Sequence, residues 1–223
     1  MNGFRAAFAI ARKDLRSELR SKESINAALS FALVILLILS FAFEPTGEET
    51  HAIAGGLLWI VFAFSGTLIL TRTFARELGN DCLEALIAAP VPGWALFLGK
   101  AFASLAMMLF VELVSLPVFA IFYDVTLVWQ IAPVLLLGTW ALVVVGVSFS
   151  ALTVNVQLRE VMLPLLIYPT LVPALISAMT LTGSLLDGGA FAGNNLIWLR
   201  LLVGFDIIYT ALAVALIDIV LVG

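Results

Sequence analysis

Six long apolar runs constrain the fold of this chain more than any other feature of its sequence. Charged or turn-forming residues separate them, and they span residues 25–43, 52–71, 95–122, 129–154, 161–181 and 196–220. The hydrocarbon core of a bilayer is about 30 Å thick, which a helix of about 20 apolar residues crosses. The chain is 63% hydrophobic and 12% charged, whereas soluble proteins average roughly 45–50% and about 25%. The sequence therefore predicts an all-α polytopic membrane protein with six transmembrane helices.

The basic residues between the runs follow an alternating pattern that orients the chain. Nine Lys and Arg residues lie in the first, third and fifth segments outside the runs, and none lies in the second, fourth and sixth. Cytoplasmic loops carry the excess of Lys and Arg, so we expect both termini in the cytoplasm. No segment between the runs is long enough for a soluble domain. Residues 1–223 are therefore expected to form a single transmembrane domain.

Residues 1–24 are predicted to form an amphipathic helix in the cytoplasmic headgroup layer. Apolar side chains recur at helical spacing in Phe4, Phe8, Ala11, Leu15 and Leu19. Basic side chains gather on an adjoining arc in Arg5, Arg12, Lys13, Arg16 and Arg20. Each Lys or Arg in such a helix gains about 1 kcal/mol from anionic lipid. The alternative is a plain positively charged anchor without a mechanical role.

The longest interior gap between the runs, residues 72–94, is predicted to be a cytoplasmic coupling segment. Asp81 is a candidate N-cap with Glu84 in the capping-box position, and Pro90 would end the short helix that follows. Its apolar patch and flanking acids would be Leu83, Leu86, Glu77, Asp81 and Glu84. Such a helix can dock into the groove of a soluble partner. The alternative is a solvated loop.

The same stretch carries a family resemblance. It has Phe-x-x-Glu from Phe74, Leu-Glu-x-Leu from Leu83, Pro-Val-Pro from Pro90 and Leu-Gly-Lys ending at Lys100. Further matches are Leu-Leu-Leu-Gly-Thr in the fourth run and the proline-spaced residues 163–173 in the fifth. This pattern resembles the ABC-2-type exporter permeases. More narrowly, it resembles the haem exporter protein B family, CcmB, of cytochrome c maturation.

The resemblance implies an ABC-2 exporter-like fold and a place in the prokaryotic cytoplasmic (inner) membrane. It implies a non-catalytic permease whose partners are a CcmA-like ATPase that binds the ATP, CcmC-like and CcmD-like membrane proteins and, indirectly, a CcmE-like haem chaperone. Haem is the candidate substrate, and no cofactor or metal is assigned to this chain. Because ABC transport uses two ATP sites, a homodimer of the chain is the simplest assembly. The candidate ATPase-coupling residues are Phe74, Glu77, Asp81, Leu83, Glu84 and Leu86.

Glu112, Arg200 and Asp206 are charged residues expected at membrane depth. A charge there costs at least about 2.5–3.5 kcal/mol, so each is a functional candidate. We expect Glu112 to face the bundle interior and either to pair with Arg200 or to face a polar cavity. The alternative for all three is structural pairing or placement near the membrane interface.

Several other functions are disfavoured or remain as alternatives. A net charge of −4 offers no basic surplus for nucleic acid, and a single Cys82 and a single His51 offer no metal cluster. The sequence has neither a phosphate-binding loop nor a recognised hydrolase motif, which disfavours an enzyme. Two alternatives stay open: an ABC-2 permease for a drug, lipid or polysaccharide, and a membrane scaffold that moves no substrate.

Overall fold

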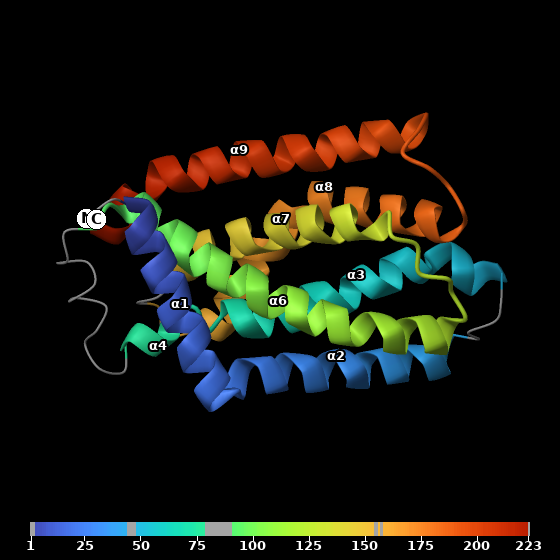
Figure 1. Ribbon diagram of the computed structural model, residues 1–223, viewed down its shortest axis with the longest axis horizontal. Coiled ribbons are helices and arrows are strands. Elements are labelled where there is room, and N and C mark those ends of the chain that lie inside the picture. The colour runs from blue at the N-terminus through green and yellow to red at the C-terminus, as the bar shows by residue number, and fades with distance from the viewer. Residues whose placement is uncertain (1–2, 44–47, 79–90, 154–155, 157, 223) are drawn as a thin grey trace.

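The computed structural model describes residues 3–43, 48–78, 91–153, 156 and 158–222, and within them the chain is helical with no strand. Figure 1 shows long helices side by side along one axis, with shorter elements at one end. The helices are α1 (Gly3–Ser21), α2 (Glu23–Ala42), α3 (Glu48–Leu70), α4 (Ala75–Leu78), α6 (Gly93–Tyr123), α7 (Ile131–Leu152), α8 (Arg159–Leu186) and α9 (Asn194–Val222).

The six predicted spans are confirmed, because six of the described helices are long and apolar enough to cross a membrane. They are α2, α3, α6, α7, α8 and α9. The largest difference from the predicted bounds is in α8, where the helix continues to Leu186 beyond the apolar run that ends at residue 181. Pro164, Pro169 and Pro173 lie inside this helix without ending it. In a membrane helix, neighbouring helices can compensate for the lost backbone donors.

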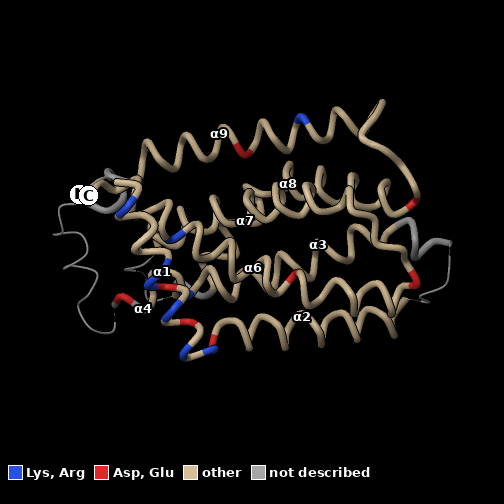
Figure 2. Tube along the Cα trace, in the orientation of Figure 1, with Lys and Arg blue, Asp and Glu red and all other residues tan. Residues whose placement is uncertain are grey.

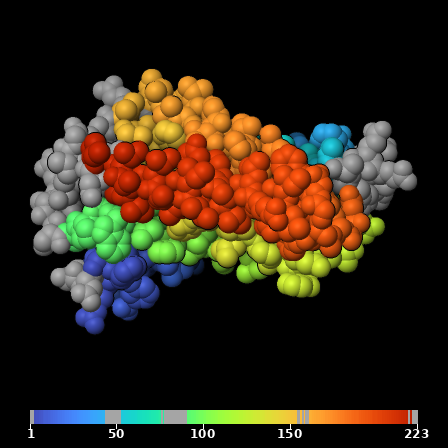
Figure 3. Space-filling model, turned by 90° about the horizontal axis from the view of Figure 1, so that it is seen from above, coloured from blue at the N-terminus to red at the C-terminus, as the bar shows by residue number. Residues whose placement is uncertain are grey.

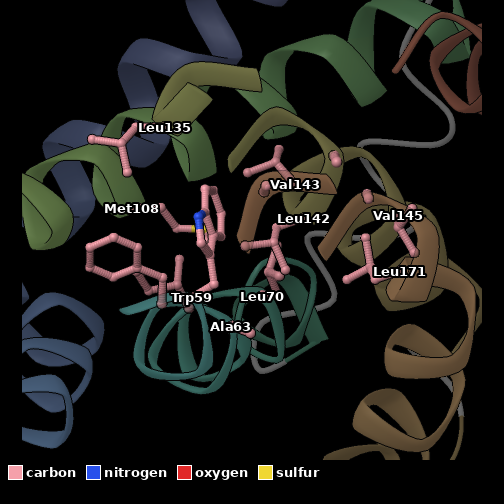
Figure 4. Packing of buried hydrophobic residues seen from close by; sticks show 14 of the residues in the cluster. Trp59, Ala63, Leu70, Met108, Leu135, Leu142, Val143, Val145 and Leu171 are labelled. Atoms are coloured by element: carbon pink, nitrogen blue, oxygen red, sulfur yellow. The ribbon is translucent and has the colours of Figure 1, made fainter. Parts of the chain in front are cut away.

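The core of the bundle is built around α3 and α7, whereas α2 and α9 lie at its margins. Figure 4 shows the Trp59 ring rising from α3 between Met108 and Leu142. Its Nε1 donates a hydrogen bond of 2.9 Å to Thr182 Oγ1 on α8. Gly138 on α7 makes room for the ring, because a Cβ there would lie 2.0 Å from the Trp59 Cη2 atom. Figure 3 shows α9 as an outer ridge along the molecule.

Helix α1 crosses the end of the bundle at a steep angle to the spans, beside α4 (Figure 1). Its buried side chains are mainly small, which lets it pack closely on α6, and they include Ala6, Ala7, Ile10 and Ala11. Gly99 on α6 permits this approach, since a Cβ there would lie 2.8 Å from the Ala7 carbonyl oxygen. The predicted apolar face is therefore divided: Ala11 is buried, whereas Phe4, Phe8 and Leu19 are exposed.

The elbow between α1 and α2 is fixed by a buried carboxylate. Lys22 adopts the left-handed conformation, with φ of 54°, and so ends α1. The Glu18 carboxylate, on the last turn of α1, accepts hydrogen bonds from the backbone N–H groups of Ser24 at 2.8 Å and Ile25 at 2.9 Å. These donors belong to the first turn of α2, where a helix leaves its N–H groups without partners. Glu18 thereby caps the first membrane span from the preceding helix.

Candidate functional site

Charged side chains gather at the end of the bundle that carries α1 and α4. Figure 2 shows Lys and Arg concentrated there, apart from one basic position on α9, which is Arg200. Four side chains at this end form one connected set that we term the charge cluster: Lys13, Asp14, Glu77 and Lys100. The cluster joins α1, α4 and α6, so it connects the start of the predicted coupling segment to the membrane bundle.

Lys100, on the second turn of α6, is the centre of the charge cluster. It is only 1% exposed. Its Nζ lies 2.6 Å from Glu77 Oε1 on α4 and 2.9 Å from Asp14 Oδ2 on α1. The same Nζ donates a hydrogen bond of 3.0 Å to the carbonyl oxygen of Thr73, just before α4. One ammonium group thus holds three segments of the chain together.

Lys13 completes the charge cluster from the partly exposed side. Its Nζ lies 2.7 Å from Glu77 Oε1 and 3.2 Å from Asp14 Oδ1. Two cations and two anions therefore balance within one site. This balance matters because removing one partner of a buried ion pair leaves an uncompensated charge, which destabilises a protein by about 3–5 kcal/mol.

The pKa directions of two members show that the charge cluster favours its ionised form. Burial alone would raise the pKa of Glu77, but the charge of Lys100 and hydrogen bonds from Lys100 and Lys13 lower it below its ordinary value. Burial alone would lower the pKa of Lys13, but its hydrogen bond to Glu77 and the charges of Asp14 and Glu77 raise it. Both groups are therefore charged around neutral pH.

Phe74 gives the charge cluster an apolar wall. It is fully buried just before α4, and the Lys100 Nζ lies 5.4 Å from the centre of its ring. An ammonium group this close to an aromatic ring gains a cation–π attraction. A cavity of about 210 Å³ adjoins the charge cluster and is lined by Lys13, Asp14, Glu77, Lys100 and Ser104, among others. Arg72 also borders the cavity and forms an ion pair with Glu23 on α2.

The structure brings together two of the predicted coupling residues, Phe74 and Glu77. The other four, Asp81, Leu83, Glu84 and Leu86, lie outside the described residues. Sequence reasoning missed Lys13 and Asp14 as members of this site. Lys100 stands in the sequence pattern only as the last residue of the Leu-Gly-Lys motif. A usable signal was the position of Lys100 inside an apolar run, where a cation needs partners.

Glu112 faces the interior of the bundle, as predicted. It is 2% exposed on α6, and its Oε1 accepts a 2.5 Å hydrogen bond from Thr139 Oγ1 on α7. The alternative pairing with Arg200 is wrong: Arg200 is exposed on α9, and no ion pair joins the two in the described part of the chain. Glu112 points toward α7, whereas Arg200 points out of the bundle.

Asp206 is the second buried carboxyl group at membrane depth. It lies near the middle of α9 and is 6% exposed. Neither of its carboxyl oxygens has a hydrogen-bond partner among the residues that the structure covers. One turn further along α9, Thr210 accepts a 3.0 Å hydrogen bond from Trp140 Nε1 on α7. Asp206 therefore faces the packed side of α9.

Comparison with known proteins gives a match along nearly the whole chain. Residues 5–218 match the family model described as CcmB protein. "Heme exporter protein B" of Rhodobacter capsulatus is 35% identical over 178 residues, which cover 75% of this chain and 78% of that protein. The protein of the same name from Paracoccus denitrificans is 33% identical over 171 residues, again 75% and 78%. The one from Pseudomonas aeruginosa is 29% identical over 200 residues, 88% of each chain.

Proposed function

Because this chain belongs to the CcmB family, we propose that it is the membrane permease of an ATP-driven haem exporter that serves cytochrome c maturation. The family match over residues 5–218 is the observation that carries the proposal. The relatives' name, haem exporter protein B, supports haem as the cargo. A separate ATPase supplies the energy, since the sequence contains no phosphate-binding loop of its own.

The charge cluster supports a route by which the ATPase acts on the membrane helices. Residues 72–94 form the contact with the ATPase, and the first part of this segment holds Phe74 and Glu77 against Lys100. A displacement of α4 is passed to α6 through Lys100 and to α1 through Lys13 and Asp14. From α1 it reaches α2 through the elbow capped by Glu18. The cluster thus couples the ATPase to two membrane spans.

The proposed function also sets the orientation of the chain in the membrane and its assembly with other proteins. The end that carries α1 and α4 faces the cytoplasm of a prokaryotic inner membrane, which places both termini and the ATPase on that side. The partners are a CcmA-like ATPase, CcmC-like and CcmD-like membrane proteins and a CcmE-like haem chaperone that is reached indirectly. Two copies of this chain match the two ATP sites of an ABC complex.

The first test is affinity purification of the full chain from its native membrane, with partners identified by mass spectrometry. We expect an ATPase encoded with cytochrome maturation genes to co-purify with the wild type. The variant Leu83→Asp with Glu84→Lys should lose the ATPase while keeping its membrane level. Arg200→Gln is the matched control, because Arg200 is exposed on α9, away from the coupling segment, and it should retain the ATPase.

The cargo is tested separately in cells that lack the gene. Restoring the wild-type chain should restore covalently bound haem in c-type cytochromes, whereas the Leu83→Asp, Glu84→Lys variant should not. Co-purification of an ATPase from another pathway, with normal cytochromes in the deleted strain, would preserve the permease assignment and contradict haem as the cargo. Absence of any ATPase would contradict the permease assignment itself.

A further inference from the structure

The outer face of α1 carries a row of arginines that the coupling route does not use. Arg12, Arg16 and Arg20 are spaced four residues apart, so they lie along one side of the helix. All three are exposed, and none forms an ion pair within the described ranges. They share one open surface of α1 with Phe8 and Ser17, among others. Three guanidinium groups on one surface fit an anionic ligand.

An apolar edge runs beside this arginine row. Phe8 is 73% exposed and Phe4 is 77% exposed, and Phe4 packs edge-on against Trp94 of α6 with ring centres 5.2 Å apart. At 3.6 residues per turn, the arginines lie around the helix between Phe8 on one side and Lys13 on the other. Lys13 points toward α4, at the end of the molecule beyond the spans. The phenylalanines therefore lie on the side turned back toward the membrane.

The order of side chains around α1, from phenylalanines through arginines to Lys13, matches the layers of a membrane surface from the acyl region to the cytoplasm. Apolar rings enter the acyl region, arginines lie at the height of the lipid phosphates, and the charge cluster faces the cytoplasm. An acidic protein surface would satisfy the arginines but would leave the exposed phenylalanines in water. Arginine also fits phosphate geometry with two parallel hydrogen bonds. The combination favours a lipid headgroup as the occupant.

We propose that the outer face of α1 is a binding site for anionic phospholipid headgroups of the cytoplasmic leaflet, held by Arg12, Arg16 and Arg20 with Phe8 as the apolar anchor. Because the same helix contributes Lys13 and Asp14 to the charge cluster, bound lipid also fixes the position of the helix that the coupling route uses. The proposal adds to the proposed function but requires only that the six helices span the membrane.

The test uses the full chain, without any ATPase, in nanodiscs that contain phosphatidylcholine and phosphatidylglycerol. Native mass spectrometry counts the lipids that stay bound after release from the nanodisc. We expect phosphatidylglycerol to be enriched over its share of the bilayer. The variant Arg12→Gln, Arg16→Gln, Arg20→Gln should lose at least fivefold of this enrichment, since a single basic residue near an anionic headgroup is worth a factor of about five.

Control variants and measurements of folding make the outcome decisive. Arg200→Gln removes an exposed arginine elsewhere and should leave the enrichment unchanged, whereas Phe8→Ser should reduce it without changing the charge. Helical content and thermal unfolding should match the wild type, because the three arginines make no ion pair among the described residues. Unchanged enrichment in the triple variant would overturn the proposal. Unchanged lipid enrichment, together with loss of the ATPase when the same variant is affinity-purified from its native membrane, would assign the arginine row to a protein partner instead.

Discussion

The charge cluster and the two carboxyl groups at membrane depth differ in the partners of their buried charged groups: the cluster has ion pairs, and the two carboxyl groups have none among the described residues. In the cluster, Lys100 and Lys13 lie within 3.2 Å of Glu77 or Asp14 in every pair. In contrast, Glu112 has only the Thr139 hydroxyl, and Asp206 has no hydrogen-bond partner, in the part of the chain that is described. The cluster therefore joins three segments of the chain by ion pairs, whereas the two carboxyl groups form no ion pair in the described structure.

The largest effect is expected where the charge cluster loses its centre. Lys100→Met removes the ammonium group that contacts α1, α4 and the Thr73 carbonyl together. Glu77 and Asp14 are then left with Lys13 alone, so we expect a loss of about 3–5 kcal/mol in the free energy of unfolding. Denaturant or thermal unfolding of the purified chain measures it. Arg200→Met, on an exposed side chain, is the control and should change stability by less than about 0.5 kcal/mol.

Glu18 is a buried acid whose carboxylate is paired with backbone N–H groups, in contrast to the ion-paired acids of the charge cluster and the two carboxyl groups at membrane depth. Glu18→Ala leaves the N–H groups of Ser24 and Ile25 without their carboxylate acceptor. We expect a loss of about 0.5–2 kcal/mol, the range for a helix cap, and fraying of the first turn of α2. Hydrogen exchange of the α2 amides reports it. Unchanged protection of Ser24 and Ile25 would show that the cap contributes nothing.

The pH dependence of stability distinguishes the ionised cluster from other contacts. Glu77 has a pKa below its ordinary value of 4.5, so its contribution is present above about pH 4.5 and is lost as pH falls through the lowered value. Lys13 has a pKa above 10.5, so its contribution is present below that pH and is lost as pH rises further.

The stability difference between the wild type and Glu77→Gln should therefore be constant between about pH 5 and 10 and should shrink in acid. Unfolding at a series of pH values measures the difference directly. A difference that changes around pH 7 would contradict the assignment, because neither shift moves a titration into that range.

The smallest effect is expected at membrane depth. Glu112→Gln keeps an oxygen that can accept the Thr139 hydroxyl, and no cation in the described structure loses a partner. We expect a change below about 1 kcal/mol, smaller than for Glu77→Gln measured in the same way. A loss as large as that of Glu77→Gln would show that Glu112 has a charged partner in the membrane. Cytochrome yield in the same variant tests whether Glu112 acts in transport.

The six spans could be predicted because the apolar runs are long and the charged gaps between them are clear. The interior position of Glu112 followed from the cost of a charge in lipid. The membership of Lys13 and Asp14 in the charge cluster could not be predicted, because it depends on contacts between helices far apart in the sequence. Lys13 on α1 meets Glu77 on α4 across 64 positions, and Asp14 meets Lys100 on α6. The helical wheel places Lys13 on a basic arc, whereas in the structure α1 packs closely over Gly99 and Lys13 contacts Glu77.

The same packing explains why the prediction of the buried face of α1 was only partly right. Small residues such as Ala6 and Ala7 approach α6 more closely than phenylalanine could, so they form the buried face. Phe8 and Leu19, which dominate a hydrophobicity pattern, are left exposed. A sequence pattern identifies an amphipathic helix but does not distinguish the face that meets protein from the face that meets lipid.

Coupling through the charge cluster is tested most directly by the amount of c-type cytochrome formed per ATP hydrolysed in the complex that carries Glu77→Gln with Lys100→Met. This double variant interrupts the charge cluster and leaves residues 79–90 unchanged. We predict that the ATPase still co-purifies and hydrolyses ATP, whereas cytochrome formed per ATP falls at least tenfold. An unchanged ratio, with the double variant present at the wild-type membrane level, would show that the cluster does not couple the ATPase to the membrane helices.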